Sequence, residues 1–474
     1  MRREPYGFPY VMELICTVSP MGKAYKRRLM PYQNEKALQE ELRKTKAFSD
    51  RLRMVEKEKE EVRHLLSDMK DLQGLMQMLL RGETLSVVDL YEVKLFARQL
   101  RQMAKPLQQL NLEEKPLHSL EGVELLLDPE KEDLATFYIY EVYDDRLKNL
   151  REEKRALETA IRKAVDGSKR TQLLLERRSL VVKEEEQEEE IRERLSKALV
   201  PFVEKMQENL TLLGRLDFFI GKAEVARNYQ LPLPKVSSSG PLSMVEGIHP
   251  YFEKILAEKN QKLTPITLSL VPGSTAITGA NMGGKSMSLK TLFLNATLVM
   301  KGILPFAKEM SMPLIEHLYL LDEDQEEMKK GLSSFGGEVL KIQEMLGSLT
   351  LKPSLIIMDE PARGTNPLEG SAIVGGLLNY FKGRPHFFLV ATHYDLKNMS
   401  GISRYQVRGL QDASLEDMKG HGEKEKMERV KELQSLMDYR LEKWDGEPIL
   451  GDAIRISEFL GFSGDLIKEI RNLL

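Results

Sequence analysis

The sequence predicts an all-helical region followed by an α/β domain with a mostly parallel sheet and C-terminal helices, the fold class α + α/β. Up to about residue 229, long stretches rich in Glu, Lys, Leu and Arg place apolar residues at helical spacing. Residues 230–241 are dense in Pro, Ser and Gly, as a linker is. Short apolar strands then alternate with helices. We therefore expect helices over 1–235, the α/β domain over 236–420 and a helical segment over 421–474.

The composition narrows the class of protein. A chain of 474 residues is too long for one core, and its net charge of −3 gives no overall basic signature for nucleic acid. Cys16 is the only cysteine, which rules out an internal disulfide and favours a reducing compartment. The N-terminus lacks the apolar core of a signal peptide, and no apolar run is long enough to span a membrane. We expect a cytoplasmic protein.

The helical region can be divided at its breaks. Residues 82–86 interrupt the first pattern, and Ser86 is a plausible N-cap of the next helix. Residues 166–168 indicate a turn between two antiparallel arms. The acidic run 184–190 is either the solvent face of a helical arm, which we favour, or a site for a partner. The expected helices cover 34–80, 86–103, 134 to 199 with the turn at 166–168, and 201–229.

A phosphate-binding motif follows the linker. Gly279, four further residues and then Gly284-Lys285-Ser286 lie between a predicted strand (274–278) and a predicted helix (286–300). Glycines let backbone N–H groups approach phosphate oxygens, and the helix N-terminus adds partial positive charge. The lysine can reach the outer phosphates of ATP, and the serine hydroxyl can hold Mg²⁺.

Two later strands complete the predicted site. The apolar strand 354–358 ends in Asp359, which can accept Mg²⁺, and Glu360, which can activate water. The strand beginning at Phe387 ends at His393, a candidate sensor of the γ-phosphate. The small-residue turn before a helix at 339–349 is an anion site that we expect to serve a second subunit.

These motifs resemble the ATPase domain of MutS proteins, which are ABC-type ATPases that dimerise around two nucleotides. The run 286–292 is similar to the anti-recombination branch, and 216–223 and 449–474 resemble the family's lever region and its C-terminal dimerisation helices. The ATPase motifs are Thr278–Ser286, Met358–Thr365, Ala391–Tyr394, Gly247–Pro250 at the domain's start, and Leu332–Phe335 with Glu338 in the trans loop.

The resemblance implies a role for each site residue. Lys285 binds the β- and γ-phosphates, Ser286 and Asp359 hold Mg²⁺, and Glu360 activates water, with Lys285, Glu360 and His393 as the catalytic set. Ser333 and Ser334 reach the nucleotide of the partner in a homodimer. The loop residues expected to contact ATP are Gly279, Asn281, Met282, Gly283, Gly284, Lys285, Ser286 and Met287.

Two functions remain open. The resemblance does not include the family's mismatch-reading and connector domains, because only a short stretch precedes Ser19. In the first interpretation the helical arms bind mismatched or branched DNA through phosphates, using basic residues at their tips (Lys163, Lys169, Arg170, Arg177 and Arg178). In the second, the chain is an ATP-driven remodeller of a protein client, as in reactivating chaperones of cobalamin-dependent aminomutases, with no role on DNA.

Overall fold

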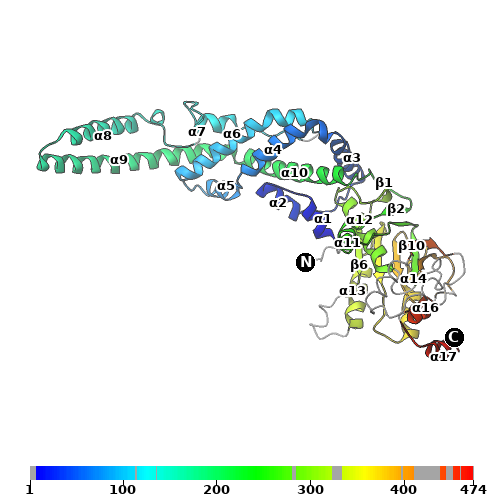
Figure 1. Ribbon diagram of the computed structural model, residues 1–474. Coiled ribbons are helices and arrows are strands. Elements are labelled where there is room, and N and C mark those ends of the chain that lie inside the picture. Colours follow the sequence, from blue (N-terminus) through cyan, green and yellow to red (C-terminus); the bar gives the residue numbers. More distant parts are fainter. Residues whose placement is uncertain are drawn as a thin grey trace. The chain divides into compact units, whose positions relative to one another are not determined.

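The computed structural model divides the chain into two compact units (Figure 1). The sheet unit contains Met1–Ile15, Met30–Asp50 and Lys222–Leu474, and the helical unit contains Cys16–Leu29 and Arg51–Gly221. The structure describes residues 7–112, 115–134, 136–279, 284–322, 334–394, 396, 399–409, 438–444, 452–459 and 461–472. Within these ranges, no helix combines the length and the apolar character needed to cross a membrane.

The helical unit confirms the helical part of the predicted fold. Ser86 caps α6 as predicted, because its hydroxyl accepts a hydrogen bond from the N–H of Asp89 and the Asp89 carboxylate accepts one from the N–H of Ser86. The elements are α2 (Pro20–Arg27), η1 (Leu52–Val55), α4 (Glu56–Asp68), α5 (Gln73–Leu80), α6 (Val87–Leu110), α7 (Glu121–Leu127), η2 (Glu141–Tyr143), α8 (Asp145–Lys163), α9 (Gly167–Leu199), η3 (Val200–Phe202) and most of α10 (Val203–Asn228).

The helix predicted from residue 134 begins only at Asp145. The preceding segment is extended because Tyr140 is buried and makes tertiary hydrogen bonds. The Tyr140 hydroxyl donates to Oδ1 of Asp128 at 3.0 Å and accepts from Nζ of Lys94 at 3.1 Å. Burial, followed by the bond to Asp128, raises the pKa of Tyr140. These contacts outweigh the local helical preference.

Two segments far apart in sequence meet around Asp217. Its carboxylate accepts hydrogen bonds from the N–H of Val18 (3.1 Å), the N–H of Ser19 (2.8 Å) and the hydroxyl of Ser19 (2.6 Å). A Cβ on Gly22 would lie 2.0 Å from Oδ2 of Asp217, so only glycine fits there. Asp217 belongs to residues 216–223, the stretch that resembles the family's lever region.

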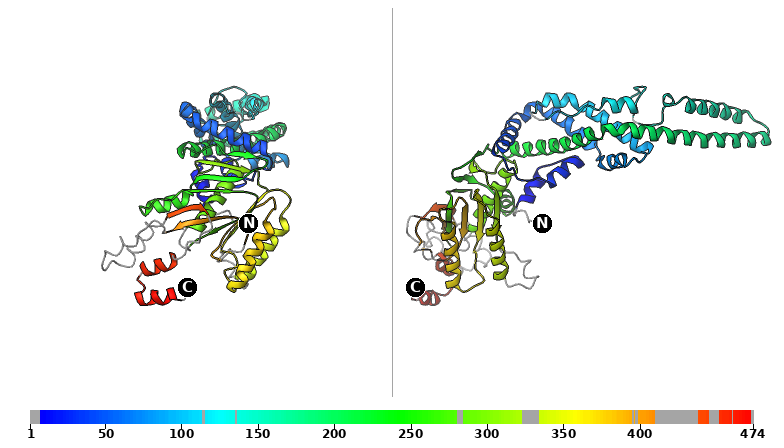
Figure 2. Two further views of the ribbon diagram at one scale, coloured as in Figure 1. Left: turned by 90° about the vertical axis from the view of Figure 1, so that its right-hand side faces the viewer. Right: turned by 180° about the vertical axis from the view of Figure 1, so that it is seen from behind.

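Helices α8 and α9 form an antiparallel arm and lie side by side in Figure 1 and in the right view of Figure 2. Ion pairs hold them together: Arg151 lies 3.0 Å from Glu184 and 2.7 Å from Glu188, and Lys154 also pairs with Glu184. Burial acts to raise the pKa of Glu184, but the bonds from Lys154 and Arg151 outweigh it and lower the pKa. The acidic run is therefore a solvent face only in part.

The sheet unit contains two sheets and the helices around them. Its helices are α1 (Phe8–Leu14), most of α3 (Glu35–Arg51), the end of α10, α11 (Pro250–Glu258), α12 (Lys285–Met300), α13 (Ser334–Ser348), α14 (Pro367–Phe381), α16 (Asp452–Phe459) and α17 (Gly464–Asn472). Its strands are β1 (Lys235–Ser237), β2 (Leu242–Gly247), β3 (Ile266–Leu270), β4 (Gly273–Thr278), β5 (Glu309–Pro313), β6 (His317–Leu321), β7 (Ser354–Asp359), β8 (Phe387–Ala391), β9 (Ser403–Gly409) and β10 (Asp438–Lys443).

The larger sheet is mostly parallel, as predicted. Its strand order is β10-β9-β4-β8-β7-β6, and only the edge pair β10–β9 is antiparallel. Ile277 of β4 pairs with Ala391 of β8, which pairs with Asp359 of β7. The carboxyl ends of these three strands therefore form one edge. Buried residues of α14 and the strands, such as Phe381 and Phe388, fill the core on one face of the sheet.

The smaller sheet, of order β1-β5-β2-β3, adjoins the C-terminal end of α12. There Nζ of Lys222, from the end of α10, pairs with Glu41 of α3 and donates to O of Gly302 at 2.8 Å. Lys222 and Glu41 are 2% and 7% exposed, so this ion pair is fully buried. Strand β1 lies inside the segment predicted as a linker.

The prediction of a helical segment over 421–474 is wrong for residues 438–443. Residues 438–441 belong to β10, which extends the sheet by pairing with β9. Charged residues alternate with Tyr439 and Leu441 in this strand, and an edge position tolerates charged side chains. The local composition alone favours a helix, but pairing with β9 makes these residues a strand.

Candidate functional site

The phosphate loop connects β4 to α12 and has a glycine at each end. Gly279 has φ +127° and Gly284 φ +79°, in the region that L side chains rarely adopt. A Cβ on Gly284 would lie 3.0 Å from Cδ1 of Tyr439, and one on Gly279 would lie 3.3 Å from Cβ of Val407. Conformation and space both favour glycine at these two positions.

Lys285 is the first residue of α12, and its side chain is 3% exposed. Its Nζ donates a hydrogen bond of 2.7 Å to O of Gly279 and lies 3.7 Å from Oε1 of Glu360. Burial lowers the pKa of Lys285, while the charges of Glu360 and Asp359 act to raise it. The ammonium is thus held between the start of the loop and the end of β7.

Asp359 ends β7 close to Ser286, the second residue of α12. Burial raises the pKa of Asp359, and a hydrogen bond from Ser286 and the charge of Lys290 act in the opposite direction. Among the described residues, the buried Oδ1 of Asp359 has no hydrogen-bond partner. A buried carboxylate oxygen without a donor is costly unless a cation or proton meets it. Asp359 and Ser286 are oxygen donors of the kind Mg²⁺ prefers, so this site fits the ion.

Glu360 follows Asp359 in a left-handed backbone conformation, with φ 50°. Its N–H donates to O of Ala391 at 2.9 Å, which fixes the turn to the end of β8. The carboxylate lies between two cations, with Oε1 3.7 Å from Nζ of Lys285 and Oε2 3.6 Å from Nη1 of Arg363. This geometry places a carboxylate beside Lys285, where the sequence predicts it.

His393 lies just beyond the end of β8, the strand between β4 and β7. The N–H of Thr392 donates to O of Ile277 at 3.0 Å, so the ends of β8 and β4 are joined at this point. The His393 side chain is exposed, and its ring lies 4.5 Å from that of Tyr394. Its position agrees with the expectation, and its role as a phosphate sensor stays a prediction.

Part of the predicted site cannot be placed. Asn281, Met282, Gly283 and Ser333 lie outside the described residues. Ser334 is the first residue of α13, and Met287 lies in the first turn of α12.

The structure adds three residues that sequence reasoning did not assign to this site. The ring of Tyr439 lies against Gly284, and burial raises its pKa. Glu338 of α13 accepts hydrogen bonds from the N–H of Ala362, and the Tyr394 hydroxyl donates to the O of Ala362. Glu338 and Tyr394 belong to the motifs named in the sequence analysis, but only the fold shows that both bind the backbone of Ala362. Tyr439 lay in the segment predicted to be helical.

The arm tip is the strongest concentration of unpaired cations that we find in the helical unit. Five exposed basic residues there have no ion pair in the described part of the chain: Arg162, Lys163, Lys169, Arg170 and Arg178. Arg177, which was also predicted to be available, instead pairs with Glu158 at 2.7 Å. Within the acidic run, Glu184 and Glu188 are neutralised by ion pairs inside the arm.

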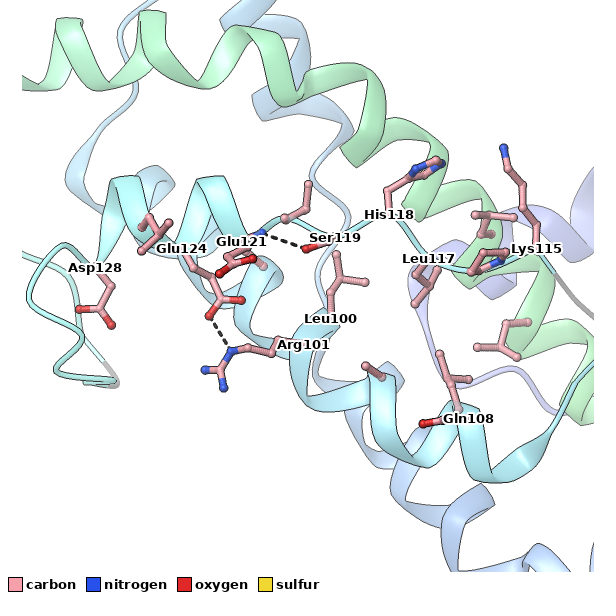
Figure 3. A pocket seen from close by; sticks show the side chains of 18 of the residues that line it. Leu100, Arg101, Gln108, Lys115, Leu117, His118, Ser119, Glu121, Glu124 and Asp128 are labelled. Atoms are coloured by element: carbon pink, nitrogen blue, oxygen red, sulfur yellow. Dashed lines mark hydrogen bonds and ion pairs between the residues drawn. The ribbon is translucent and has the colours of Figure 1, made fainter.

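A separate cavity of about 1010 Å³ lies in the helical unit among α6, residues 115–121, α7 and α10 (Figure 3). Leucines such as Leu100 and Leu117 line it, and Arg101 at its edge pairs with Glu124 at 2.7 Å. None of the predicted site residues lines this cavity. We therefore assign it no part in nucleotide binding.

A glycine-bounded loop, a buried lysine and two acids at the carboxyl ends of parallel strands define a P-loop nucleotide-binding protein. Residues 275–435 match the family model described as MutS domain V, so this part of the chain is a domain of the MutS type. Domain V is the ATPase domain of that family, and the chain is accordingly an ATPase.

Similar proteins carry the name Endonuclease MutS2. The chain is 29% identical over 298 residues to the protein of Clostridium tetani (strain Massachusetts / E88), covering 62% of this chain and 35% of that one. It is 28% identical over 300 residues to the protein of Listeria monocytogenes serotype 4b (strain CLIP80459), covering 63% and 35% respectively. The chain thus spans about a third of the length of these curated relatives.

Proposed function

We propose that this chain hydrolyses ATP in a homodimer with composite sites and couples hydrolysis to movement of its helical arms, which bind mismatched or branched DNA through phosphate contacts. The observation that best supports ATP hydrolysis is the distance of 3.7 Å between Nζ of Lys285 and Oε1 of Glu360, at the edge of the sheet where β4 and β7 end. Phosphoryl transfer depends mainly on positioning and charge stabilisation, and this edge supplies both.

Each residue of the site has a proposed task. Lys285 binds the outer phosphates, and the carboxylate of Glu360 orients and deprotonates the attacking water. Ser286 and Asp359 hold Mg²⁺, which neutralises phosphate charge when bound. The unpartnered Oδ1 of Asp359 supports this assignment. His393 senses the γ-phosphate from the end of β8.

The dimer is proposed from the trans loop and the C-terminal helices. Ser333 and Ser334 would complete the nucleotide site of the partner, as the small-residue stretch before α13 in the sequence suggests. The segment 421–474 would hold the partner's ATPase domain. Its described helix α17 is amphipathic, with Ile467 buried and Leu466 45% exposed, and such an exposed apolar side chain suits a subunit contact.

Binding of DNA is proposed from the charge of the arm tip. Five exposed cations without ion pairs are the groups that neutralise phosphates, and they contact no particular base sequence. The name of the relatives, Endonuclease MutS2, also points to nucleic acid. The alternative, a remodeller of a protein client, relied in part on the acidic arm, and internal pairing of Glu184 and Glu188 weakens that part of the argument.

The ATPase assignment is tested with Lys285→Ala and Glu360→Gln. Lys285→Ala should lose ATP binding, whereas Glu360→Gln should bind ATP but hydrolyse it at least about 100-fold more slowly. Glu344→Gln, on the exposed face of α13, is the matched carboxylate control and should behave as wild type. Light scattering of the Glu360→Gln protein with ATP should show a dimer. Wild-type turnover in both site variants would refute the assignment.

The DNA assignment is tested by a salt series with homoduplex, mismatched and four-way-junction DNA. A triple variant, Lys163→Ala, Lys169→Ala and Arg170→Ala, should lower the slope of log affinity against log salt by about 3. Lys183→Ala, an exposed cation of α9 outside the tip, should leave the slope unchanged. Absence of binding at low salt, with ATPase activity intact, would favour a protein client.

A further inference from the structure

The turn after the catalytic strand is held in an unfavourable conformation. Glu360 has φ 50° and Ala362 has φ 62°, both in the left-handed region. For residues other than glycine this conformation costs roughly 1–2 kcal/mol each. It persists only where the surrounding structure imposes it, so the groups that hold the turn determine where the Glu360 carboxylate lies.

The middle of the turn is fixed at both of its backbone polar groups. The N–H of Ala362 donates to Oε1 and Oε2 of Glu338, at 3.1 and 3.2 Å. The hydroxyl of Tyr394 donates to the O of Ala362 at 3.0 Å. Ala362 is 1% exposed, so water cannot replace either bond without the turn opening.

The two holding groups come from elements outside the turn. Glu338 lies in the second turn of α13, and Tyr394 follows β8. Only glycine at position 370 of α14 leaves room for Tyr394, because a Cβ there would lie 2.2 Å from the hydroxyl oxygen of Tyr394. Both side chains act directly on the backbone of Ala362, two residues beyond Glu360.

We propose that Glu338 and Tyr394 are positioning residues that hold the carboxylate of Glu360 beside Lys285. The proposal rests on the function proposed above for Glu360. Loss of either bond would let the turn relax toward an ordinary backbone conformation and carry the carboxylate away from the attacking water. A displacement on the order of 1 Å is enough to cost about 100-fold in rate.

The test is steady-state ATP hydrolysis by Glu338→Ala, Glu338→Gln and Tyr394→Phe. We expect kcat to fall about 10- to 100-fold in Glu338→Ala and less in the two conservative variants, while ATP affinity changes less than about threefold. Glu344→Gln on the same helix is the control and should retain wild-type kcat. If Glu338→Ala does not fold, Glu338→Gln and Tyr394→Phe decide the question.

A double-mutant cycle separates positioning from general damage. In the Glu360→Gln background, Glu338→Ala should change the residual rate by less than about twofold, because its effect passes through the missing carboxylate. An unchanged kcat in the single variants, or an equal fall in both backgrounds, would overturn the inference while leaving the role of Glu360 intact. Full activity of Glu360→Gln itself would overturn both proposals.

Discussion

Removing Lys222 should strongly destabilise the sheet unit. The Lys222→Met change leaves Glu41 as a buried charge without this partner and takes a donor from O of Gly302. Breaking a buried ion pair by removing one partner typically costs about 3–5 kcal/mol. At roughly 2–4 °C for each kcal/mol, the melting temperature should fall by about 6–20 °C. The double variant Lys222→Met with Glu41→Leu should recover most of this loss, because no charge is then stranded.

Tryptophan fluorescence can be used to measure the unfolding of the sheet unit in these variants. Trp444 is the only tryptophan and follows β10, so its fluorescence follows unfolding of the sheet unit. Asp50→Asn is the matched control, since it breaks an exposed pair with Lys46 and should cost at most about 0.5 kcal/mol. The reasoning would be refuted if the Lys222→Met protein melted at the same temperature as this control. It would also be refuted if the double variant melted no higher than the single variant.

Three further predictions concern other buried contacts. Gly284→Ala should weaken ATP binding about tenfold or more, because the residue has φ +79° and a Cβ would lie only 3.0 Å from the Tyr439 ring, and equilibrium titration with wild-type affinity would contradict this. Asp359→Asn should raise the melting temperature of the nucleotide-free protein by about 2–4 °C at pH 7. Burial raises the pKa of Asp359 above 3.8, so its ionisation opposes folding at neutral pH, and the gain should vanish as the pH falls toward 3.8. Gly22→Ala should lower the urea midpoint because its Cβ would meet Asp217 at 2.0 Å, whereas Gly74→Ala, with open space around it, should not.

The phosphate site was predictable because its elements are local and strongly patterned. Buried parallel strands appear as continuous apolar runs, so β4, β7 and β8 could be recognised from short stretches, and motif residues stand at their ends. Lys285 and Glu360 were paired on the expectation that such ends meet, and the register of the sheet brings them together.

What escaped prediction depends on contacts between distant residues. The strand at 438–443 exists because β9 offers an edge to pair with, and no local signal distinguishes it from a charged helix. Tyr140 keeps residues before α8 extended through Lys94 and Asp128, against the helical composition of that stretch. Glu338 and Ala362 meet only after α13 has packed beside β7's end. Such pairings are set by tertiary structure and not by propensity.

The arm carries its fully buried side chains at one end only. Leu147, Glu184 and Gln187 are buried, but no side chain between residues 148 and 183 is. Helices of this length gain most of their stability from packing, so the distal part has little to prevent fraying. Backbone amides should therefore exchange with solvent progressively faster toward the bend at residue 166. A bound polyanion that contacts both α8 and α9 would slow this exchange, and the tip would become ordered only when it holds its ligand.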